Sequence, residues 1–395
     1  MKRDLKECLM RFLNGYIYRG IKEGFSYGGF EVKKASFSKL FFYDREDRDK
    51  YTSQGEYEDL EDGFVIPGLV DLHIHGAMGA DFSRAKEGDL YTMGSYLLSR
   101  GVCFFAAASM TLPEKELERA YKRAADFYEN TPGDCARLMG IYMEGPFLSA
   151  GRKGSQNSRY IMKPDIEMVK RLDAYSKGLL KVVCIAPELY GAMDFIKELS
   201  KDHRISLAHT ETDYEKAALA FELGAREITH LYNAMLPLHH RNPGLIAAGA
   251  EREEVRAELI CDGIHVHPSM VRAAFKLFPG RICLISDATS ALGMKDGIYE
   301  LGGLKTSLKG RKLLLNDGSQ TIAGSATDLY DCMLNAVKFG ISKEEAIYSA
   351  SLLPAEAIGC DHLIGSIHEG KLADFILCDK DLKRRRVYHE GIALR

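Results

Sequence analysis

The sequence lacks long runs of charge of one sign: 53 lysines and arginines nearly balance 56 aspartates and glutamates, and the formal net charge is −3. A balanced surface offers neither a footprint for nucleic acid nor a basic patch for a membrane. The densest basic segment is Lys383–Arg386, which we interpret as a solvated edge. Nucleic acid and membranes are therefore not expected as partners.

Paired cysteines are also missing. The nine cysteines are scattered singly and form no Cys-x-x-Cys motif, which argues against a disulfide framework or a structural zinc and fits a reducing compartment. No segment approaches the ~18 apolar residues of a membrane span, and Met1–Glu7 lacks the apolar stretch of a signal peptide. We therefore expect a cytoplasmic protein.

The chain has 395 residues, of which 46% are hydrophobic, so it can bury a large core. From Gly68 onward, short apolar runs alternate with segments of helical period, which predicts a parallel sheet with crossover helices. The predicted strands are 68–75, 102–109, 138–144, 180–186, 205–209, 227–231, 257–264 and 282–287. Amphipathic segments between them include 114–128, 165–175, 192–201 and 214–223. Eight such strand and helix units predict an α/β fold with a TIM-type (β/α)8 barrel.

Both ends of the chain differ from this pattern. Residues 1–66 contain short β-like pieces (16–18, 29–32 and 39–43) and little helical period, and residues 364–395 are similar, with a predicted strand at 373–378. We expect the two ends to form one small β-sandwich domain outside a barrel that covers residues 67–363. A glycine-punctuated β insertion at about 297–315 follows the eighth predicted strand and is expected at the rim of the site.

Six side chains able to bind a metal or carry a proton lie in or at the ends of the predicted strands. His73 and His75 point to the same face of an extended strand, and the carboxyl ends of other strands bear Glu144, His209, His230 and Asp287. Each could alone be a hydrogen-bonded histidine or a carboxylate that caps a helix. Because barrel enzymes place their active sites at this end, the set together predicts a metal site. Imidazole and carboxylate ligands suit zinc, iron or manganese better than calcium or magnesium.

The motifs of this chain resemble those of the N-acetylglucosamine-6-phosphate deacetylase family within the amidohydrolase superfamily. The resemblance covers nearly the whole length, and the most diagnostic part of its Thr229–Met235 segment is His-Leu-Tyr-Asn-Ala-Met at His230–Met235. Further matching segments are Met143–Phe147, Asp262–His265, Ser286–Thr289, Ala323–Ala326 and Gly365–Asp374. The resemblance implies a metal-dependent hydrolase of amino-sugar metabolism that releases acetate from N-acetylglucosamine 6-phosphate.

The resemblance also implies roles for individual residues. Glu144, His209 and His230 would hold the main metal ion, and Asp287 would be the catalytic acid and base. The implied substrate contacts are Ser155, Gln156, Asn233, Ala234, Arg241, His265, Ile322, Ala323 and Gly324. In the family the arginine reaches into the site of a neighbouring subunit, so a homodimer is expected.

Two positions vary within the family. Many relatives have a histidine where this chain has Gln156, which can donate a hydrogen bond to a carbonyl oxygen but cannot become cationic, so slower turnover or a different acetamido sugar is open. Some single-metal relatives replace both histidines of the His-x-His pair with amides. The presence of His73 and His75 favours a second ion in this chain, with Glu144 as a bridge.

Three alternatives remain at this point. The substrate could be the galactosamine epimer, the reaction could be the ring opening of a cyclic amidase such as dihydroorotase, or the barrel could be a binding protein without catalysis. Cyclic amidases usually bridge two metals with a carboxylated lysine, and the glutamate at position 144 argues against them. One or two divalent ions are expected, zinc or iron by preference, but the ligands do not choose between these metals.

Overall fold

The structure is a computed structural model that describes residues 9–394. The segment Met1–Glu7, on which the expectation of no signal peptide rests, lies outside the described residues. Within them, no helix combines the length and the apolar character needed to cross a membrane.

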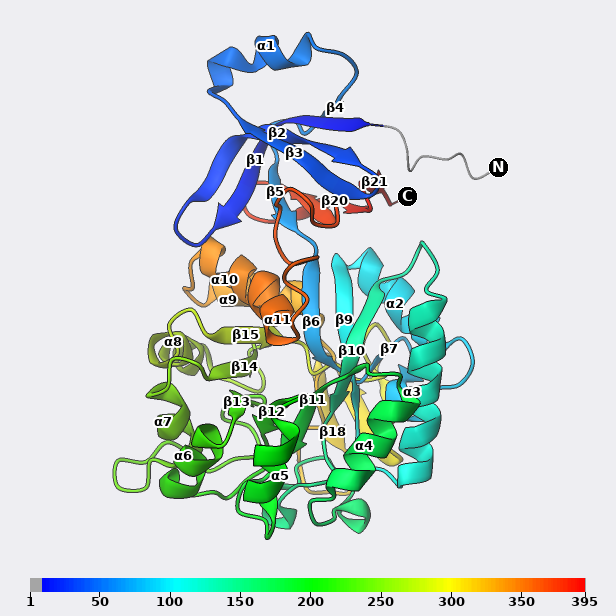
Figure 1. Ribbon diagram of the computed structural model, residues 1–395, viewed down its shortest axis with the longest axis vertical. Coiled ribbons are helices and arrows are strands. Elements are labelled where there is room, and N and C mark those ends of the chain that lie inside the picture. Colours follow the sequence, from blue (N-terminus) through cyan, green and yellow to red (C-terminus); the bar gives the residue numbers. More distant parts are fainter. Residues whose placement is uncertain (1–8, 395) are drawn as a thin grey trace.

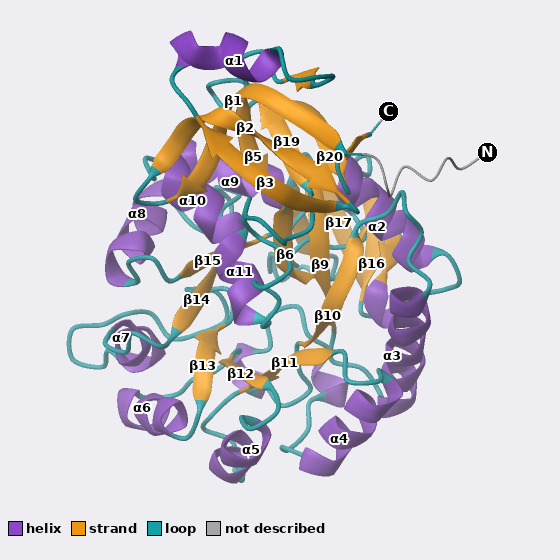
Figure 2. Cartoon of the chain, turned by 45° about the horizontal axis from the view of Figure 1, so that its top comes forward, coloured by secondary structure: helices purple, strands orange, loops and turns teal. Residues whose placement is uncertain are grey.

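Eight parallel strands form the central sheet, and the helices lie around it (Figures 1 and 2). The strands pair in chain order: β6 (Leu69–Ile74), β9 (Val102–Ser109), β10 (Arg137–Met143), β11 (Leu180–Ile185), β12 (Arg204–Leu207), β13 (Ala225–Ile228), β14 (Arg256–Ile260) and β15 (Ile282–Ile285). The first and last strands meet through backbone hydrogen bonds, from Asp287 N to the oxygen of His73 (3.0 Å) and from His75 N to the oxygen of Ala288 (2.8 Å). The predicted (β/α)8 barrel is confirmed.

The outer helices follow from their apolar periodicity. In α3 (Glu114–Glu129) the buried residues Leu117, Ala120, Tyr121, Ala124 and Ala125 recur at helical spacing and cover one face. The other helices are α2 (Asp89–Ser99), α4 (Ile166–Tyr175), α5 (Ala192–Leu199), α6 (Tyr214–Glu222), α7 (Gly244–Ala250), α8 (Pro268–Leu277), α9 (Leu329–Lys338), α10 (Lys343–Ala350), α11 (Leu352–Ala357) and the short α1 (Arg48–Thr52). The sequence predictions for α3 to α6 agree with these bounds to within two residues.

Strands from both chain ends form a second sheet above the barrel in Figure 1. It contains β1 (Met10–Gly20), β2 (Gly24–Lys33), β3 (Ser36–Phe42), β4 (Glu58–Asp59), β5 (Phe64–Pro67), β19 (Phe375–Cys378), β20 (Arg384–His389) and β21 (Ile392–Ala393). Aromatic rings from both ends form its core, since the ring of Phe375 lies 5.2 Å from that of Phe12 and 4.3 Å from that of Tyr388. The β5 strand continues almost directly into β6, so this sheet lies beyond the amino-terminal end of that barrel strand.

A small antiparallel sheet follows β15, as the glycine-rich insertion predicts. Its strands are β16 (Gly297–Leu301), β17 (Leu304–Lys309) and β18 (Lys312–Leu315), and a two-stranded piece pairs β7 (Gly76–Ala77) with β8 (Ala80–Asp81). The backbone NH of Ala323, beyond the insertion, donates to the oxygen of Leu313. This contact brings the insertion beside the 320–324 segment at the carboxyl end of the barrel.

Several predicted strands extend too far at their carboxyl ends. The structure ends β12 at Leu207 and β15 at Ile285, whereas the sequence prediction continues each strand to the following histidine or aspartate. His209 and Asp287 adopt positive φ angles of 44° and 47°, which an extended strand does not accommodate. The apolar run therefore ends where the left-handed backbone of His209 or Asp287 interrupts the strand.

Candidate active site and metal centre

The six predicted ligands converge at the carboxyl end of the barrel. One group consists of Glu144, His209 and His230, and the other of His73, His75 and Asp287. Within each group the candidate ligand atoms lie within 4.8 Å of one another, and all six residues are buried. The sequence predicted these residues as a set, and the fold brings them to one place.

Glu144 lies between the two groups. Its Oε1 is 3.0 Å from Nε2 of both His209 and His230, and its Oε2 is 3.2 Å from Nε2 of His75. On the far side, Nε2 of His75 lies 3.1 Å from Oδ1 of Asp287. One carboxylate therefore has an oxygen toward each group, which is the geometry of a bridging ligand.

The donor set fits a pair of divalent ions. Imidazole Nε2 atoms approach one another directly, at 3.3 Å between His73 and His75 and at 3.1 Å between His209 and His230. Two deprotonated nitrogens this close repel each other unless a cation lies between them or one takes a proton. A metal supplies that positive charge and needs the lone pairs that these nitrogens offer.

The pKa shifts show how strongly the cluster needs positive charge. Burial by itself would raise the pKa of Glu144, but hydrogen bonds with His209 and His230 hold it well below its usual range. Burial likewise opposes the low pKa of Asp287, which the hydrogen bond with His75 produces. Although burial lowers the pKa of His75, Asp287 and Glu144 raise it to about 9. Without metal, the two carboxylates therefore favour the protonated form of His75.

Backbone strain accompanies the site. His209, His230 and Asp287 have φ angles of 44°, 30° and 47°, in the left-handed region. Such conformations cost of order 1–3 kcal/mol each and persist only where the surrounding structure holds them. Three candidate ligands are strained in the same way, each just beyond a barrel strand, which supports this end of the barrel as the candidate site.

A cavity of about 350 Å³ opens above the two groups, a volume suited to a small molecule. Its polar and charged walls include His75, Glu144, His209, His230 and Asp287. The remaining lining residues are Gly154, Ser155, Asn233, Ala234, His265, Leu301, Gln320, Thr321, Ile322 and Gly324. The predicted catalytic residue Asp287 and several predicted substrate contacts therefore line the same cavity.

A model of the amidohydrolase family matches residues 64–391, which is most of the chain. The chain belongs to the amidohydrolase family. The resemblance identified from the sequence motifs is confirmed.

Individual relatives of this amidohydrolase are similar over most of their length. N-acetylglucosamine-6-phosphate deacetylase of Bacillus subtilis (strain 168) is 35% identical over 85% of both chains. N-acetylgalactosamine-6-phosphate deacetylase of Escherichia coli O157:H7 is 33% identical over 83% of this chain and 86% of its own. Among solved structures, a variant of N-acetyl-D-glucosamine-6-phosphate deacetylase from Mycobacterium smegmatis, in complex with N-acetyl-D-glucosamine-6-phosphate, superimposes with a TM-score of 0.88 at 28% identity, covering 98% of this chain and 99% of that one.

Sequence reasoning missed the partners behind the ligands of this amidohydrolase. Glu258, fully buried on β14, places Oε2 3.1 Å from Nδ1 of His73 and accepts a 3.3 Å hydrogen bond from the backbone NH of His230. Nδ1 of His75 faces the oxygen of Ala108 at 3.0 Å. Such partners fix the ring orientation and would leave Nε2 available to a metal ion. The sequence did offer a signal for Glu258, because a glutamate within an apolar barrel strand needs a buried partner.

The predicted substrate contacts fall into two sets. Ser155, Asn233, Ala234, Ile322 and Gly324 line the cavity, and so does His265, whose Nδ1 lies 2.7 Å from Oδ2 of Asp262. Arg241, Gln156 and Ala323 do not line it.

The three residues outside the cavity differ in position. Arg241 is exposed in the loop before α7, beside His239 and His240, and Ala323 is fully buried next to the lining residues. Gln156 is buried and its amide nitrogen contacts Glu144 rather than the open space. A single chain therefore brings most, but not all, of the predicted substrate contacts to the cavity.

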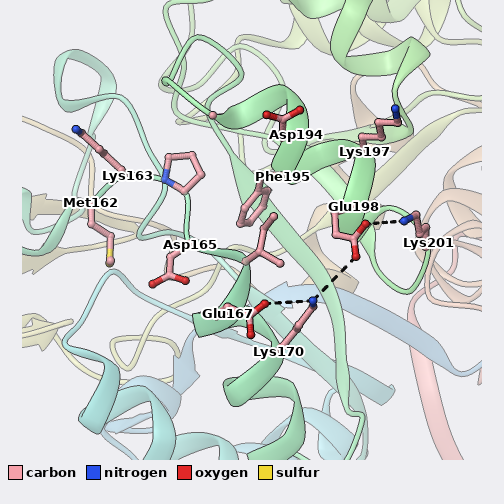
Figure 3. Close-up of a pocket in the computed structure, with 13 residues that line it drawn as sticks. Met162, Lys163, Asp165, Glu167, Lys170, Asp194, Phe195, Lys197, Glu198 and Lys201 are labelled. Atoms are coloured by element: carbon pink, nitrogen blue, oxygen red, sulfur yellow. Dashed lines mark hydrogen bonds and ion pairs between the residues drawn. The ribbon is translucent and has the colours of Figure 1, made fainter.

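A larger groove of about 800 Å³ lies outside the barrel along α4 and α5 (Figure 3). Three ion pairs join four of its charged side chains: Lys170 lies 3.2 Å from Glu167 and 4.0 Å from Glu198, which also binds Lys201 at 2.5 Å. None of the predicted site residues lines this groove. The groove therefore lies at the surface between two helices, whereas most of the candidate metal ligands line the smaller cavity.

Proposed function

We propose that this chain is a metal-dependent amide hydrolase that removes acetate from N-acetylglucosamine 6-phosphate. The observation that carries the proposal is the pair of candidate ligand groups beside the cavity. Glu144 of one group lies 3.2 Å from Nε2 of His75 in the other group, which also contains Asp287. Relatives with this activity and the sugar-phosphate complex of a similar structure support the choice of substrate.

The proposed reaction divides the work between metal and protein. Divalent ions, when bound by the two groups, polarise the acetamide carbonyl and make water a stronger acid. Asp287, 11% exposed at its side chain and held 3.1 Å from Nε2 of His75, takes a proton from the attacking water. It returns a proton to the nitrogen as the carbon–nitrogen bond breaks. The water oxygen ends in acetate, and the sugar phosphate leaves with a free amine.

Recognition of the phosphate is proposed for His265 and Arg241. His265 lines the cavity, and its Nδ1 is engaged by Asp262, which leaves Nε2 for a ligand. Arg241 lies outside the cavity of its own chain, so we propose that it serves the site of a second subunit in a homodimer. A guanidinium suits this role because its planar fork donates two parallel charged hydrogen bonds to phosphate.

The galactosamine epimer is the second candidate substrate, because a relative of equal similarity carries that name. A catalytically inactive binding protein is less consistent with the complete ligand groups and Asp287. We further propose zinc or iron as the metal, with up to two ions per chain. We also propose a cytoplasmic location, which the singly scattered cysteines of the sequence favour.

Acetate release tests the function directly. The metal-loaded wild type is expected to release acetate from at least one of the two phosphorylated sugars. Asp287→Asn keeps the shape of the side chain but removes its basic carboxylate, so kcat is expected to fall at least about a hundredfold. Metal analysis of both proteins controls for lost ions. Absence of release from either sugar by the fully loaded wild type would refute the deacetylase assignment.

A mixing experiment tests the proposed role of Arg241. Arg241→Ala and Asp287→Asn are each expected to be poorly active on the phosphorylated sugar alone. After denaturation and joint refolding, mixed dimers would contain one site with both residues, restoring about a quarter of the wild-type sites in an equal mixture. If the refolded mixture has only the average activity of the two variants, Arg241 does not act in the site of the partner subunit.

A further inference from the structure

Gln156 lies behind the metal centre rather than in the substrate cavity. It is 1% exposed, and its amide nitrogen is 2.6 Å from Oε2 of Glu144 and 3.6 Å from the sulfur of Met110. Its amide oxygen accepts a 2.8 Å hydrogen bond from the backbone NH of Thr111. The side chain therefore joins the loop after β9 to the ligand that follows β10.

The orientation of this amide is determined by chemistry. A backbone NH can only donate, so the atom of Gln156 that faces Thr111 must be the oxygen. The NH2 group must then face Glu144, which as a carboxylate can only accept. Both amide hydrogens have partners, since the second points to the weakly accepting sulfur of Met110. Gln156 has no donor left for a substrate carbonyl.

The surrounding backbone supports this network at close range. The NH of Glu144 donates to the oxygen of Ser109 at 3.1 Å. Gly145 has a φ of +90°, and a Cβ there would lie 2.2 Å from Oγ1 of Thr111, so a larger residue would separate the two loops. Gln156 thus bridges segments that already pack tightly together.

The hydrogen bond falls on one particular oxygen of Glu144. Oε1 faces His209 and His230, whereas Oε2 faces His75 and receives the bond from Gln156. Holding Oε2 stops the carboxylate from rotating and keeps one oxygen toward each ligand group. The same bond draws electron density from Oε2 and so tunes its strength as a ligand.

We infer that Gln156 is a positioning residue that orients Glu144 as the bridge between the two metal positions, and not a contact of the substrate acetamide. The inference rests on the proposed metal-dependent function. It differs from the role that the family resemblance implies for this position.

Metal affinity measured without substrate tests the inference. Gln156→Met keeps the length of the side chain but removes both hydrogen bonds, and we expect zinc affinity, measured by competition with a chromophoric chelator, to fall about 10–100-fold. Gln156→His can accept from Thr111 at one ring nitrogen and donate to Glu144 from the other, so it should recover part of the loss. Asn157→Ala is the matched control, because the Asn157 side chain bonds within its own loop, to the NH of Arg159.

Further readouts separate positioning from substrate binding and from misfolding. The visible spectrum of the cobalt-loaded protein reports ligand geometry, and it should change in Gln156→Met but not in Asn157→Ala. Thermal unfolding of the metal-free proteins identifies any variant that fails to fold. With the sugar phosphate, kcat should fall more than KM rises.

The inference would be overturned if a folded Gln156→Met protein kept wild-type zinc affinity and an unchanged cobalt spectrum but had a raised KM. That result would make Gln156 a substrate contact. If the wild type releases no acetate yet Gln156→Met still loses zinc affinity, the proposed function fails while the positioning role stands. Loss of zinc affinity without any recovery in Gln156→His would also contradict the hydrogen-bond account.

Discussion

Glu258 offers a sharp test of how the barrel interior supports the metal centre. Its carboxylate is fully buried and touches both ligand groups through Oε2, at 3.1 Å from Nδ1 of His73 and 3.3 Å from the NH of His230. Its other oxygen, Oε1, has no hydrogen-bond partner among residues 9–394. We predict that Glu258→Leu weakens metal binding about 10–100-fold and changes the stability of the metal-free protein only modestly.

The magnitude follows from what the substitution removes. Leucine leaves two buried NH groups without an acceptor, at about 1–3 kcal/mol each. It also removes a buried carboxylate with an unpaired oxygen, whose desolvation penalty is at least as large. These opposing contributions leave the metal-free free energy of unfolding changed by only about 1–2 kcal/mol. Without its acceptor, however, the ring of His73 is free to turn and change tautomer, which lowers metal affinity about 10–100-fold, or about 1.4–2.8 kcal/mol.

Two assays on the same proteins separate the effects. Urea unfolding of the metal-free protein gives the stability change, and chelator competition gives the zinc dissociation constants. Glu258→Gln is the matched control, because its amide oxygen can still accept from His73, so its loss of affinity should be smaller. A folded Glu258→Leu protein with zinc affinity within twofold of wild type would refute the reasoning.

Three more predictions concern ion number, ligand-linked stability and a structural arginine. His73→Ala combined with His75→Ala should reduce the fully loaded protein from two ions to one by elemental analysis. Two retained ions would show that the histidine pair does not hold the second ion. Removing the metal with a chelator should lower the unfolding temperature. A ligand at a thousand times its dissociation constant stabilises the folded protein by about 4 kcal/mol. An unchanged unfolding temperature would mean that the ions bind too weakly to support the fold. Arg281 donates hydrogen bonds to five backbone oxygens, three of them within 2.9 Å. Arg281→Met should therefore lower the free energy of unfolding by about 3 kcal/mol or more. Zinc affinity should not change. A loss below 1 kcal/mol in urea unfolding would contradict that account.

The alternation of apolar runs and amphipathic segments was sufficient to predict the barrel, because strand and helix periodicity are local properties of the chain. The ligand set was predictable for a related reason. Parallel strands bring their carboxyl ends to one edge, so residues such as Glu144 and His230 can be grouped without knowing any distance. The predicted ends of the strands were less accurate, because the left-handed backbone at His209 and Asp287 depends on the tertiary structure around it.

By itself, the sequence determined the family, the barrel and the residues able to bind metal. Only the tertiary structure decided which side-chain atoms contact one another. It placed Glu258 behind His73 from a distant strand and turned the amide of Gln156 toward Glu144. It also left Arg241 outside the cavity of its own chain. These outcomes depend on packing between segments far apart in sequence, where a shift of about 1 Å separates a hydrogen bond from no bond at all.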